Sequence, residues 1–262
     1  MKRPPIVVVM GHVDHGKTTL LDYVRKTNLA AKEAGQITQS IGAYEIKHQD
    51  NKITFIDTPG HEAFSQMRER GSQIADIAIL IVAADEGVKQ QTKEAYKIIK
   101  ESKTPFVVAV NKIDKPNADI NRVKNELAQE SILLEGAGGD ISWQAISAKT
   151  GEGVKELLEK VFLEAELLEL QANPDKLALG TVVEAFLDKG RGYVSTILVQ
   201  AGTLKVGDYV LAGKNSGKVK AMHDERGNKV IEARPSTPVS VLGLDGAPQA
   251  GDKFNVFEDE RE

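Results

Sequence analysis

The chain has 262 residues, no cysteine and a formal net charge of −4. The absence of cysteine excludes disulfides and cysteine-ligated zinc sites, and it fits a reducing compartment, so we expect a cytoplasmic protein. The net charge excludes a general polyanion-binding protein, and any contact with nucleic acid would have to be local. No apolar run reaches the ~20 residues that span a bilayer, and no membrane partner is expected.

Short apolar runs alternate with amphipathic stretches from the start of the chain to about residue 165. The runs are almost continuous, as in parallel strands that are covered on both faces, and they predict strands over residues 5–10, 53–57, 77–84, 106–110 and 143–148. The amphipathic stretches predict helices over residues 17–26, 62–73, 90–102, 119–130 and 153–165. Residues 43–57 predict an antiparallel hairpin that turns at Asp50-Asn51. This order predicts a doubly wound α/β domain with a mostly parallel sheet.

The last third of the chain has a different pattern. The final helix of the α/β part is expected to run on to Asn173-Pro174, where the proline ends it. From about Leu179, short strands are separated by Gly, Asp, Asn or Pro at roughly ten-residue spacing, which predicts a small antiparallel β-barrel. We therefore expect an α/β domain over 1–166, a helical linker over 167–177 and a β-barrel domain over 178–262.

The segment "GHVDHGKT", Gly11 to Thr18, has the spacing of a phosphate-binding loop and stands between a strand and a helix. Its glycines let backbone N–H groups surround a phosphate chain, and the helix N-terminus adds partial positive charge. We expect Lys17 to reach the β- and γ-phosphates and the Thr18 hydroxyl to bind Mg²⁺. His12 and His15 are interpreted as spacers within the loop. The residues expected to bind nucleotide here are Asp14, His15, Gly16, Lys17, Thr18 and Thr19.

Two further segments suit the γ-phosphate and its metal. In "DTPG" (57–60), Asp57 is placed to hold the Mg²⁺ shell through water, and the Gly60 N–H can approach the γ-phosphate. The alternative is an ordinary strand-to-loop turn. In residues 35–45, Thr38 can bind Mg²⁺ through its hydroxyl and the γ-phosphate through its N–H, so loss of the phosphate would release the loop. The alternative there is a plain surface loop.

The segments "NKID" (111–114) and "SAK" (147–149) follow the fifth and sixth strands. Guanine presents its N1–H and 2-amino group side by side, and the Asp114 carboxylate can accept from both. Adenine cannot donate this pair, so ATP is disfavoured. Asn111 is expected to brace the loops and approach N7, and the stem of Lys112 can lie over the base. The alternative is a helix N-cap at Asp114 among ordinary polar loop residues.

The Ala148 N–H is expected to donate to the O6 atom of guanine. The expected base-binding residues are Asn111, Lys112, Asp114, Ser147, Ala148 and Lys149.

Together, "GHVDHGKT", "DTPGH", "NKID" and "SAK" make residues 1–166 resemble the GTP-binding domain of translational GTPases. Segments of both domains, such as "IGAY", "LDKGRG" and "VGDY", are similar to the initiation-factor group of that family. The resemblance implies a P-loop GTPase fold, Mg²⁺, and conversion of GTP to GDP at a low intrinsic rate that the ribosome stimulates. It implies contacts with both ribosomal subunits and their RNA. It also implies initiator tRNA binding only through domains absent from this chain, which we expect to be a monomeric fragment.

His61 follows "DTPG", where many related switches carry Gln. Its ring could orient the attacking water or, when protonated, offset charge on the γ-phosphate, and the sequence leaves both roles open. The resemblance implies that Val13 and Ile37 hold this catalytic His away until large-subunit RNA draws it in. The alternative is a solvated residue at the start of a helix.

Asp14 would bring a carboxylate close to phosphates that repel it. The resemblance implies a monovalent cation, K⁺ or Na⁺, between Asp14, GTP and the backbone near Gln36. The alternative is that the Asp14 carboxylate accepts a hydrogen bond from a loop amide N–H.

Two other functions fit the same motifs. One is an elongation-type translational GTPase that delivers aminoacyl-tRNA, and the other is a GTP-gated ribosome-binding module with little catalysis of its own. The cations of the barrel domain are interpreted either as a solvated face or as a local contact with small-subunit ribosomal RNA.

Overall fold

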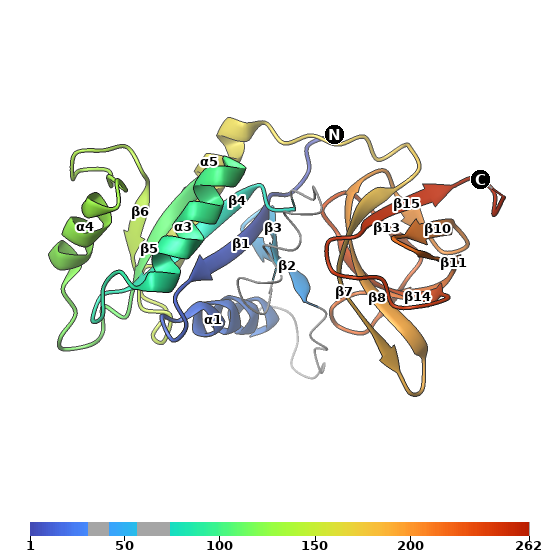
Figure 1. Ribbon diagram of the computed structural model, residues 1–262, viewed down its shortest axis with the longest axis horizontal. Coiled ribbons are helices and arrows are strands. Elements are labelled where there is room, and N and C mark those ends of the chain that lie inside the picture. Colours follow the sequence, from blue (N-terminus) through green and yellow to red (C-terminus); the bar gives the residue numbers. More distant parts are fainter. Residues whose placement is uncertain (31–41, 57–73, 262) are drawn as a thin grey trace. The chain divides into compact units, whose positions relative to one another are not determined.

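The computed structural model describes residues 1–30, 42–56 and 74–261 (Figure 1). These residues fall into two compact units, which are described separately. The sheet unit comprises the described parts of residues 7–33 and 75–169, and the barrel unit comprises those of 1–6, 34–74 and 170–262. The division follows packing and not chain order, because the described parts of two stretches from the first third of the chain, 1–6 and 34–74, group with the barrel.

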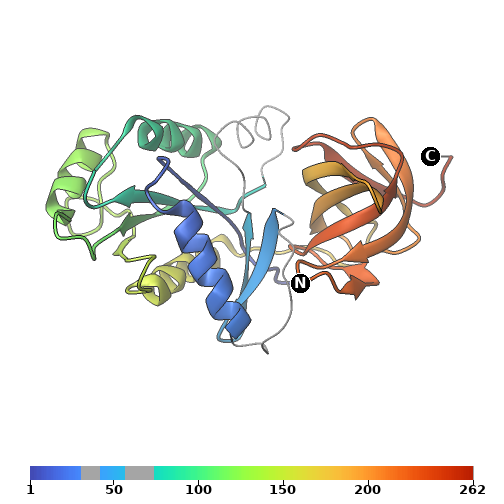
Figure 2. The same ribbon diagram turned by 90° about the horizontal axis from the view of Figure 1, so that it is seen from below.

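Parallel strands form the centre of the sheet unit. They are β1 (Ile6–Gly11), β4 (Ile77–Ala83), β5 (Phe106–Asn111) and β6 (Trp143–Ala145). Every residue of β1 and β4 is buried, which is why these strands are uninterrupted apolar runs. The helices are α1 (Lys17–Ala30), α3 (Gln90–Ser102), α4 (Ile120–Gln129) and α5 (Val154–Leu168). Figure 2 shows α3 on one face of the strands and α1 and α5 on the other, so the predicted doubly wound α/β fold is confirmed.

A hairpin of β2 (Ala43–His48) and β3 (Asn51–Ile56) extends the strand order to β2-β3-β1-β4-β5-β6. Because His48 pairs with Asn51, the turn consists of Gln49 and Asp50, one residue earlier than predicted. Gln49 adopts a φ of 56°, the left-handed conformation that a tight hairpin turn requires.

Two element ends differ from the sequence prediction. β6 stops at Ala145 and not at residue 148, because the chain turns there and the Ser147 N–H donates to the Glu152 carbonyl at 2.9 Å. The expected continuation of the last helix to Asn173-Pro174 is also wrong, since α5 ends at Leu168.

The end of α5 has a tertiary cause. Glu169 takes a left-handed φ of 49°, and the segment predicted as a helical linker, 167–177, is not helical after this residue. The chain beyond it pairs with the N-terminal residues instead. The Arg3 N–H donates to the Leu170 carbonyl at 3.2 Å, and Lys2 forms an antiparallel bridge with Gln171.

The barrel unit contains a closed antiparallel barrel, as predicted. Its ring order is β10-β15-β7-β8-β14-β11, and the ring closes because β10 also pairs with β11. The ring strands are β7 (Leu179–Asp188), β8 (Gly192–Ala201), β10 (Tyr209–Ala212), β11 (Asn215–His223), β14 (Pro238–Leu244) and β15 (Lys253–Phe257). The short strands are β9 (Leu204–Lys205), β12 (Lys229–Val230) and β13 (Glu232–Ala233). Alternate residues of the ring strands fill the interior, with Val182, Ile197 and Phe254 fully buried.

The β2–β3 hairpin packs within the barrel unit. An apolar cluster joins it to the barrel and consists of Ile6, Ile56, Ile74, Val183 and Leu198. The Thr54 hydroxyl donates to the Ser236 carbonyl at 2.5 Å, and both residues are completely buried. The hairpin and the barrel are therefore held together by apolar contacts and by a buried hydrogen bond.

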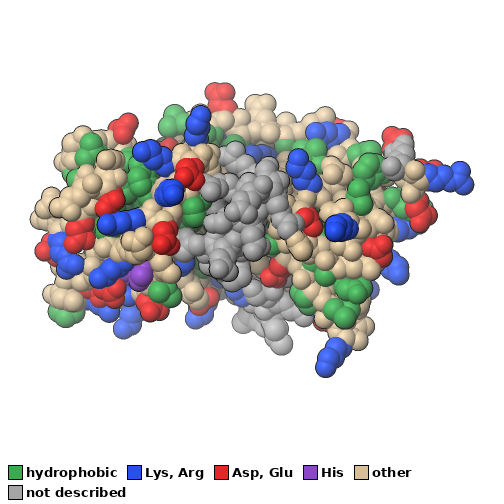
Figure 3. All heavy atoms as spheres, viewed as in Figure 1, with side chains coloured by type: hydrophobic (Ala, Val, Ile, Leu, Met, Phe, Trp, Pro, Cys, Tyr) green, Lys and Arg blue, Asp and Glu red, His purple; other side chains and the backbone are tan. Residues whose placement is uncertain are grey.

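The surface carries charges of both signs. Figure 3 shows Lys and Arg side chains interspersed with Asp and Glu on the visible face. Contacts of this face with nucleic acid would thus depend on individual cations and not on a uniformly basic surface. Within residues 1–30, 42–56 and 74–261, no helix has the length and apolar character needed to cross a bilayer.

Candidate functional site

The loop from β1 to α1 comes very close to the neighbouring strands. Gly16 has a φ of 105°, and a Cβ atom there would lie 2.1 Å from Asn111 Nδ2, so only glycine fits without displacing that amide. Asp14 also takes a left-handed φ, of 65°. α1 begins at Lys17, so the first-turn N–H groups of the helix lie directly after the loop. This arrangement suits an anion with several oxygens.

Lys17 supplies the positive charge of this loop. Its side chain is half-buried, and burial lowers the pKa of the ammonium group. No carboxylate of the described residues offsets that effect. A bound phosphate would supply the missing negative charge. Thr18 and Thr19 follow at exposed positions of the first helical turn, where the Thr18 hydroxyl offers the hard oxygen donor that Mg²⁺ prefers.

Asn111, at the end of β5, connects two of the predicted binding loops. Its Nδ2 donates to the His15 carbonyl at 2.8 Å, and its Oδ1 accepts from the Ala148 N–H at 2.9 Å. The residue is only 2% exposed, so these bonds are shielded from water. The predicted bracing role matches this geometry. The Ala148 N–H, however, is bonded within the protein, and its predicted contact with O6 of guanine would require sharing or exchange of that bond.

Asp114 is oriented by a second polar contact. The Ser147 hydroxyl donates to Asp114 Oδ1 at 2.9 Å, which fixes the carboxylate beside the loop after β6. Lys112 adopts a left-handed φ of 64°, and its ammonium group donates to the Asp14 carbonyl. Lys149 is exposed. Segments far apart in the sequence thus meet at the carboxyl ends of parallel strands, the usual ligand position in open α/β sheets.

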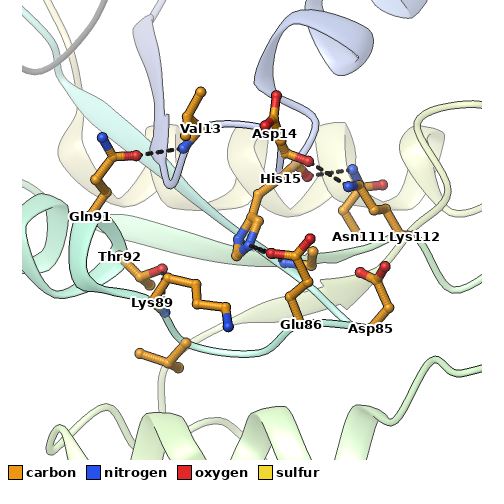
Figure 4. A network of polar contacts seen from close by, with 12 residues as sticks. Val13, Asp14, His15, Asp85, Glu86, Lys89, Gln91, Thr92, Asn111 and Lys112 are labelled. Atoms are coloured by element: carbon orange, nitrogen blue, oxygen red, sulfur yellow. Dashed lines mark hydrogen bonds and ion pairs between the residues drawn. The ribbon is translucent and has the colours of Figure 1, made fainter.

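His15 is part of the phosphate loop and is completely buried, and Figure 4 shows its side chain between the loop and Glu86. Its Nδ1 accepts from the Ala83 N–H at 3.2 Å, and its Nε2 lies 3.2 Å from Glu86 Oε2. Burial is the main effect on this ring and lowers the pKa of His15, while Glu86 acts in the opposite direction. The neutral tautomer with hydrogen on Nε2 satisfies both contacts. The sequence interpretation as a spacer missed these contacts.

Gln91, at the start of α3, is a second residue that the sequence did not indicate. Its Oε1 accepts from the Val13 N–H at 2.6 Å, as Figure 4 shows. Val13 itself is 54% exposed and lies in the part of the loop predicted to serve as a gate. The sequence assigned no role in the loop to Gln91 or Glu86, because both reach the loop across more than 70 residues of sequence.

Several predicted residues lie outside the described part of the chain. They are Thr38, Asp57, Gly60 and His61, together with Ile37 of the predicted gate. Thr18 is therefore the one predicted Mg²⁺ ligand that the structure describes. Within the described ranges, no group of three or more His, Asp or Glu side chains is arranged to hold a metal ion.

The carboxylate of Asp14 is exposed and forms no hydrogen bond with any described residue, while its carbonyl accepts from Lys112. The alternative, a hydrogen bond from a loop amide N–H to this carboxylate, is therefore not observed in the part of the chain that the structure describes.

Comparison with known proteins gives matches to both halves of the chain. The family model "Elongation factor Tu GTP binding domain" matches residues 2–166, and "Elongation factor G domain 2" matches residues 177–257. A translation initiation factor IF-2 from Christiangramia forsetii is 67% identical over 261 residues, which cover 99% of this chain and 28% of that protein. A translation initiation factor IF-2 from Parabacteroides distasonis is 60% identical, with 99% and 27% covered. The chain thus spans less than a third of these relatives.

Solved structures are similar over the whole chain. GDP-bound aIF5B from Aeropyrum pernix has a TM-score of 0.85 and 33% identity, with 100% of this chain and 55% of that chain covered. Translation elongation factor SelB from Methanococcus maripaludis, in complex with the GTP analogue GppNHp, has a TM-score of 0.73 and 28% identity. In that comparison 99% of this chain and 56% of the other are covered.

Proposed function

The chain belongs to the family of the elongation factor Tu GTP binding domain, and we propose that it is the GTP-binding and GTP-hydrolysing part of a bacterial translation initiation factor IF-2. In this proposal residues 1–166 bind and hydrolyse GTP, 167–177 link the domains, and 178–262 form the barrel domain. Named relatives at 58% to 67% identity along the whole chain support the assignment.

The observation that carries the proposal is the set of three polar contacts around Asn111 and Asp114. Asn111 ties the phosphate loop to the loop of Ala148, and Ser147 orients the Asp114 carboxylate. One carboxylate oriented in this way can accept the N1–H and the 2-amino hydrogen of guanine together. Phosphate binding at Lys17 and base recognition at Asp114 are then parts of one site.

Hydrolysis would use residues of the phosphate loop together with residues outside the described part of the chain. Thr18, Thr38 and Asp57 would hold Mg²⁺, which neutralises charge on the β- and γ-phosphate oxygens. Lys17 and the Gly60 N–H would bind the γ-phosphate, and His61 would position the attacking water or offset developing charge. The exposed carboxylate of Asp14 would be a ligand of a bound K⁺ or Na⁺ next to the phosphates.

The partners follow from the proposed identity. The ribosome would stimulate a slow intrinsic GTPase through large-subunit RNA near His61, and individual cations of the barrel would contact small-subunit RNA. Initiator tRNA would bind through domains outside this chain, and the protein would act as a monomer in the cytoplasm. An elongation-type factor is the second candidate, favoured by the structural similarity to SelB, but its identity of 28% is far below the 67% of the initiation factor.

GTP turnover with and without 70S ribosomes tests the catalytic part of the proposal. We expect ribosomes to accelerate turnover by the parent chain strongly, and His61→Ala to lower the stimulated rate by about 100-fold or more, as for loss of a positioned catalytic group. GTP binding by His61→Ala should match the parent, which separates catalysis from binding. Equal ribosome-stimulated turnover in both proteins would instead support a GTP-gated module without a catalytic role for His61.

A further inference from the structure

The end of β4 presents a backbone donor that no strand satisfies. The Ala84 N–H donates to the Asn111 carbonyl at 2.7 Å, so even-numbered N–H groups of β4 face β5. Because successive N–H groups of a strand point to opposite sides, the Ala83 N–H faces the side of β1. The register of β1 with β4, however, ends at the pair Gly11 and Ile81. A buried N–H at this position needs another acceptor.

The ring of His15 is that acceptor. Its Nδ1 lies 3.2 Å from the Ala83 nitrogen, where the next carbonyl of β1 would be if the strand continued. Since a backbone N–H can only donate, the ring hydrogen is on Nε2, which donates to Glu86 Oε2 at 3.2 Å. The His12 ring, with its centroid 4.9 Å away, packs against the same imidazole.

The same residue is fixed through its main chain. The His15 carbonyl accepts from Asn111 Nδ2 at 2.8 Å, so the side chain is attached to the end of β4 and the backbone to the end of β5. The loop that carries Glu86 is itself anchored, because Arg122 Nη2 donates to the Glu86 carbonyl at 2.8 Å. Displacement of His15 would therefore disturb the phosphate loop between Gly11 and Lys17.

We propose that His15 is a positioning residue for nucleotide binding: its buried ring replaces a strand carbonyl and holds the phosphate loop to β4, with Glu86 orienting the ring. The phosphate-loop spacing leaves this position unspecified, so the requirement comes from the Ala83 N–H, which β1 leaves without a strand carbonyl, and not from the motif. This inference rests on the proposed GTP-binding function. It assigns to His15 an action through the loop and not a direct contact with the phosphates.

Substitutions that separate hydrogen bonding from volume test this role. The Oδ1 of His15→Asn lies as many bonds from Cα as Nδ1 and can accept from Ala83, whereas His15→Leu fills similar space without an acceptor. Dissociation of a fluorescent GDP is measured by stopped flow, next to the melting temperature of each nucleotide-free variant. We expect His15→Leu to release GDP about 10-fold faster or more, and His15→Asn to stay within about threefold of the parent.

Glu86→Ala gives a milder test at a side chain that is 42% exposed and expected to tolerate truncation. We expect GDP release about threefold faster in Glu86→Ala and unchanged in Glu94→Ala, an exposed glutamate of α3. Equal release from His15→Asn and His15→Leu would overturn the proposal. If His15→Leu does not fold, GDP release from Glu86→Ala at the parent's rate would overturn the proposal. Failure of the parent chain to bind GDP would instead contradict the proposed function.

Discussion

Lys17 carries a half-buried ammonium group whose lowered pKa reflects burial without compensation from any described carboxylate. Burial disfavours the charged form of such a group, and a bound anion favours it. Burial of the Lys17 charge should thus lower the stability of the nucleotide-free protein. The same charge should raise the affinity for a nucleotide phosphate.

Lys17→Met removes the charge and keeps most of the chain length. We expect the nucleotide-free variant to melt at the parent's temperature or above it, because a half-buried charge is replaced by an apolar group. GDP affinity should fall about 10- to 100-fold with loss of charged hydrogen bonds to phosphate. Calorimetry and thermal unfolding measure both effects.

Lys26→Met, at an exposed position of the same helix, is the matched control and should change neither quantity. A nucleotide-free Lys17→Met that melts well below the parent would contradict this electrostatic account.

At the same scale, the sequence indicated some site residues and could not indicate others. Lys17, Asn111 and Asp114 were predicted because each follows a strand in a short segment of fixed spacing. Glu86 and Gln91 were not, since their contacts with the phosphate loop cross 71 and 78 residues of sequence and depend on where the chain places α3 and the end of β4.

At the scale of elements, the β2–β3 hairpin has a special position. By chain order it belongs to the predicted α/β domain, yet it shares an apolar cluster and a buried hydrogen bond with the barrel. The predicted ligand Asp57 directly follows the described part of this hairpin in the sequence, and the predicted ligand Thr38 lies four residues before it. The described residues assigned to the base and the phosphates lie outside the hairpin, so the contribution of its attachment to stability can be measured separately from GDP binding.

Thr54→Val removes the hydroxyl that donates to the Ser236 carbonyl and leaves this buried acceptor unsatisfied. We expect a loss of about 1–3 kcal/mol in the free energy of unfolding, measured in urea, with GDP affinity within about twofold of the parent. Thr27→Val, at an exposed position of α1, should cost less than about 0.5 kcal/mol. Equal stability of the two variants would show that the buried bond contributes nothing.

Local patterns predicted elements well and their ends poorly. The runs of β1 and β4 are apolar because both faces of these strands are covered. Burial therefore restricts every residue of each strand, and the sequence pattern shows this. No local pattern marks the end of α5, because it depends on the hydrogen bond between Leu170 and Arg3, which lies near the N-terminus. The hairpin turn at Gln49 was misplaced by one residue because the side chain there does not favour a left-handed φ as strongly as Asn or Gly would.

At the scale of the whole molecule, an α/β sheet unit carries the candidate nucleotide site, and the closed barrel is a separate compact unit. The chain covers 26% to 29% of the length of the initiation factors it is similar to. We propose that this chain binds guanine nucleotides without the rest of such a factor. Every described residue assigned to the base and the phosphates lies in its sheet unit.

Calorimetric titration of the magnesium-containing protein with GDP and with ADP tests this claim most directly, for the parent and for Asp114→Asn. The account predicts that the parent binds GDP at least about 100-fold more tightly than ADP, since two charge-assisted hydrogen bonds to Asp114 are available only to guanine. Asp114→Asn should lose most of that preference. Similar affinities of the parent for both nucleotides, or an unchanged preference in Asp114→Asn, would contradict the account.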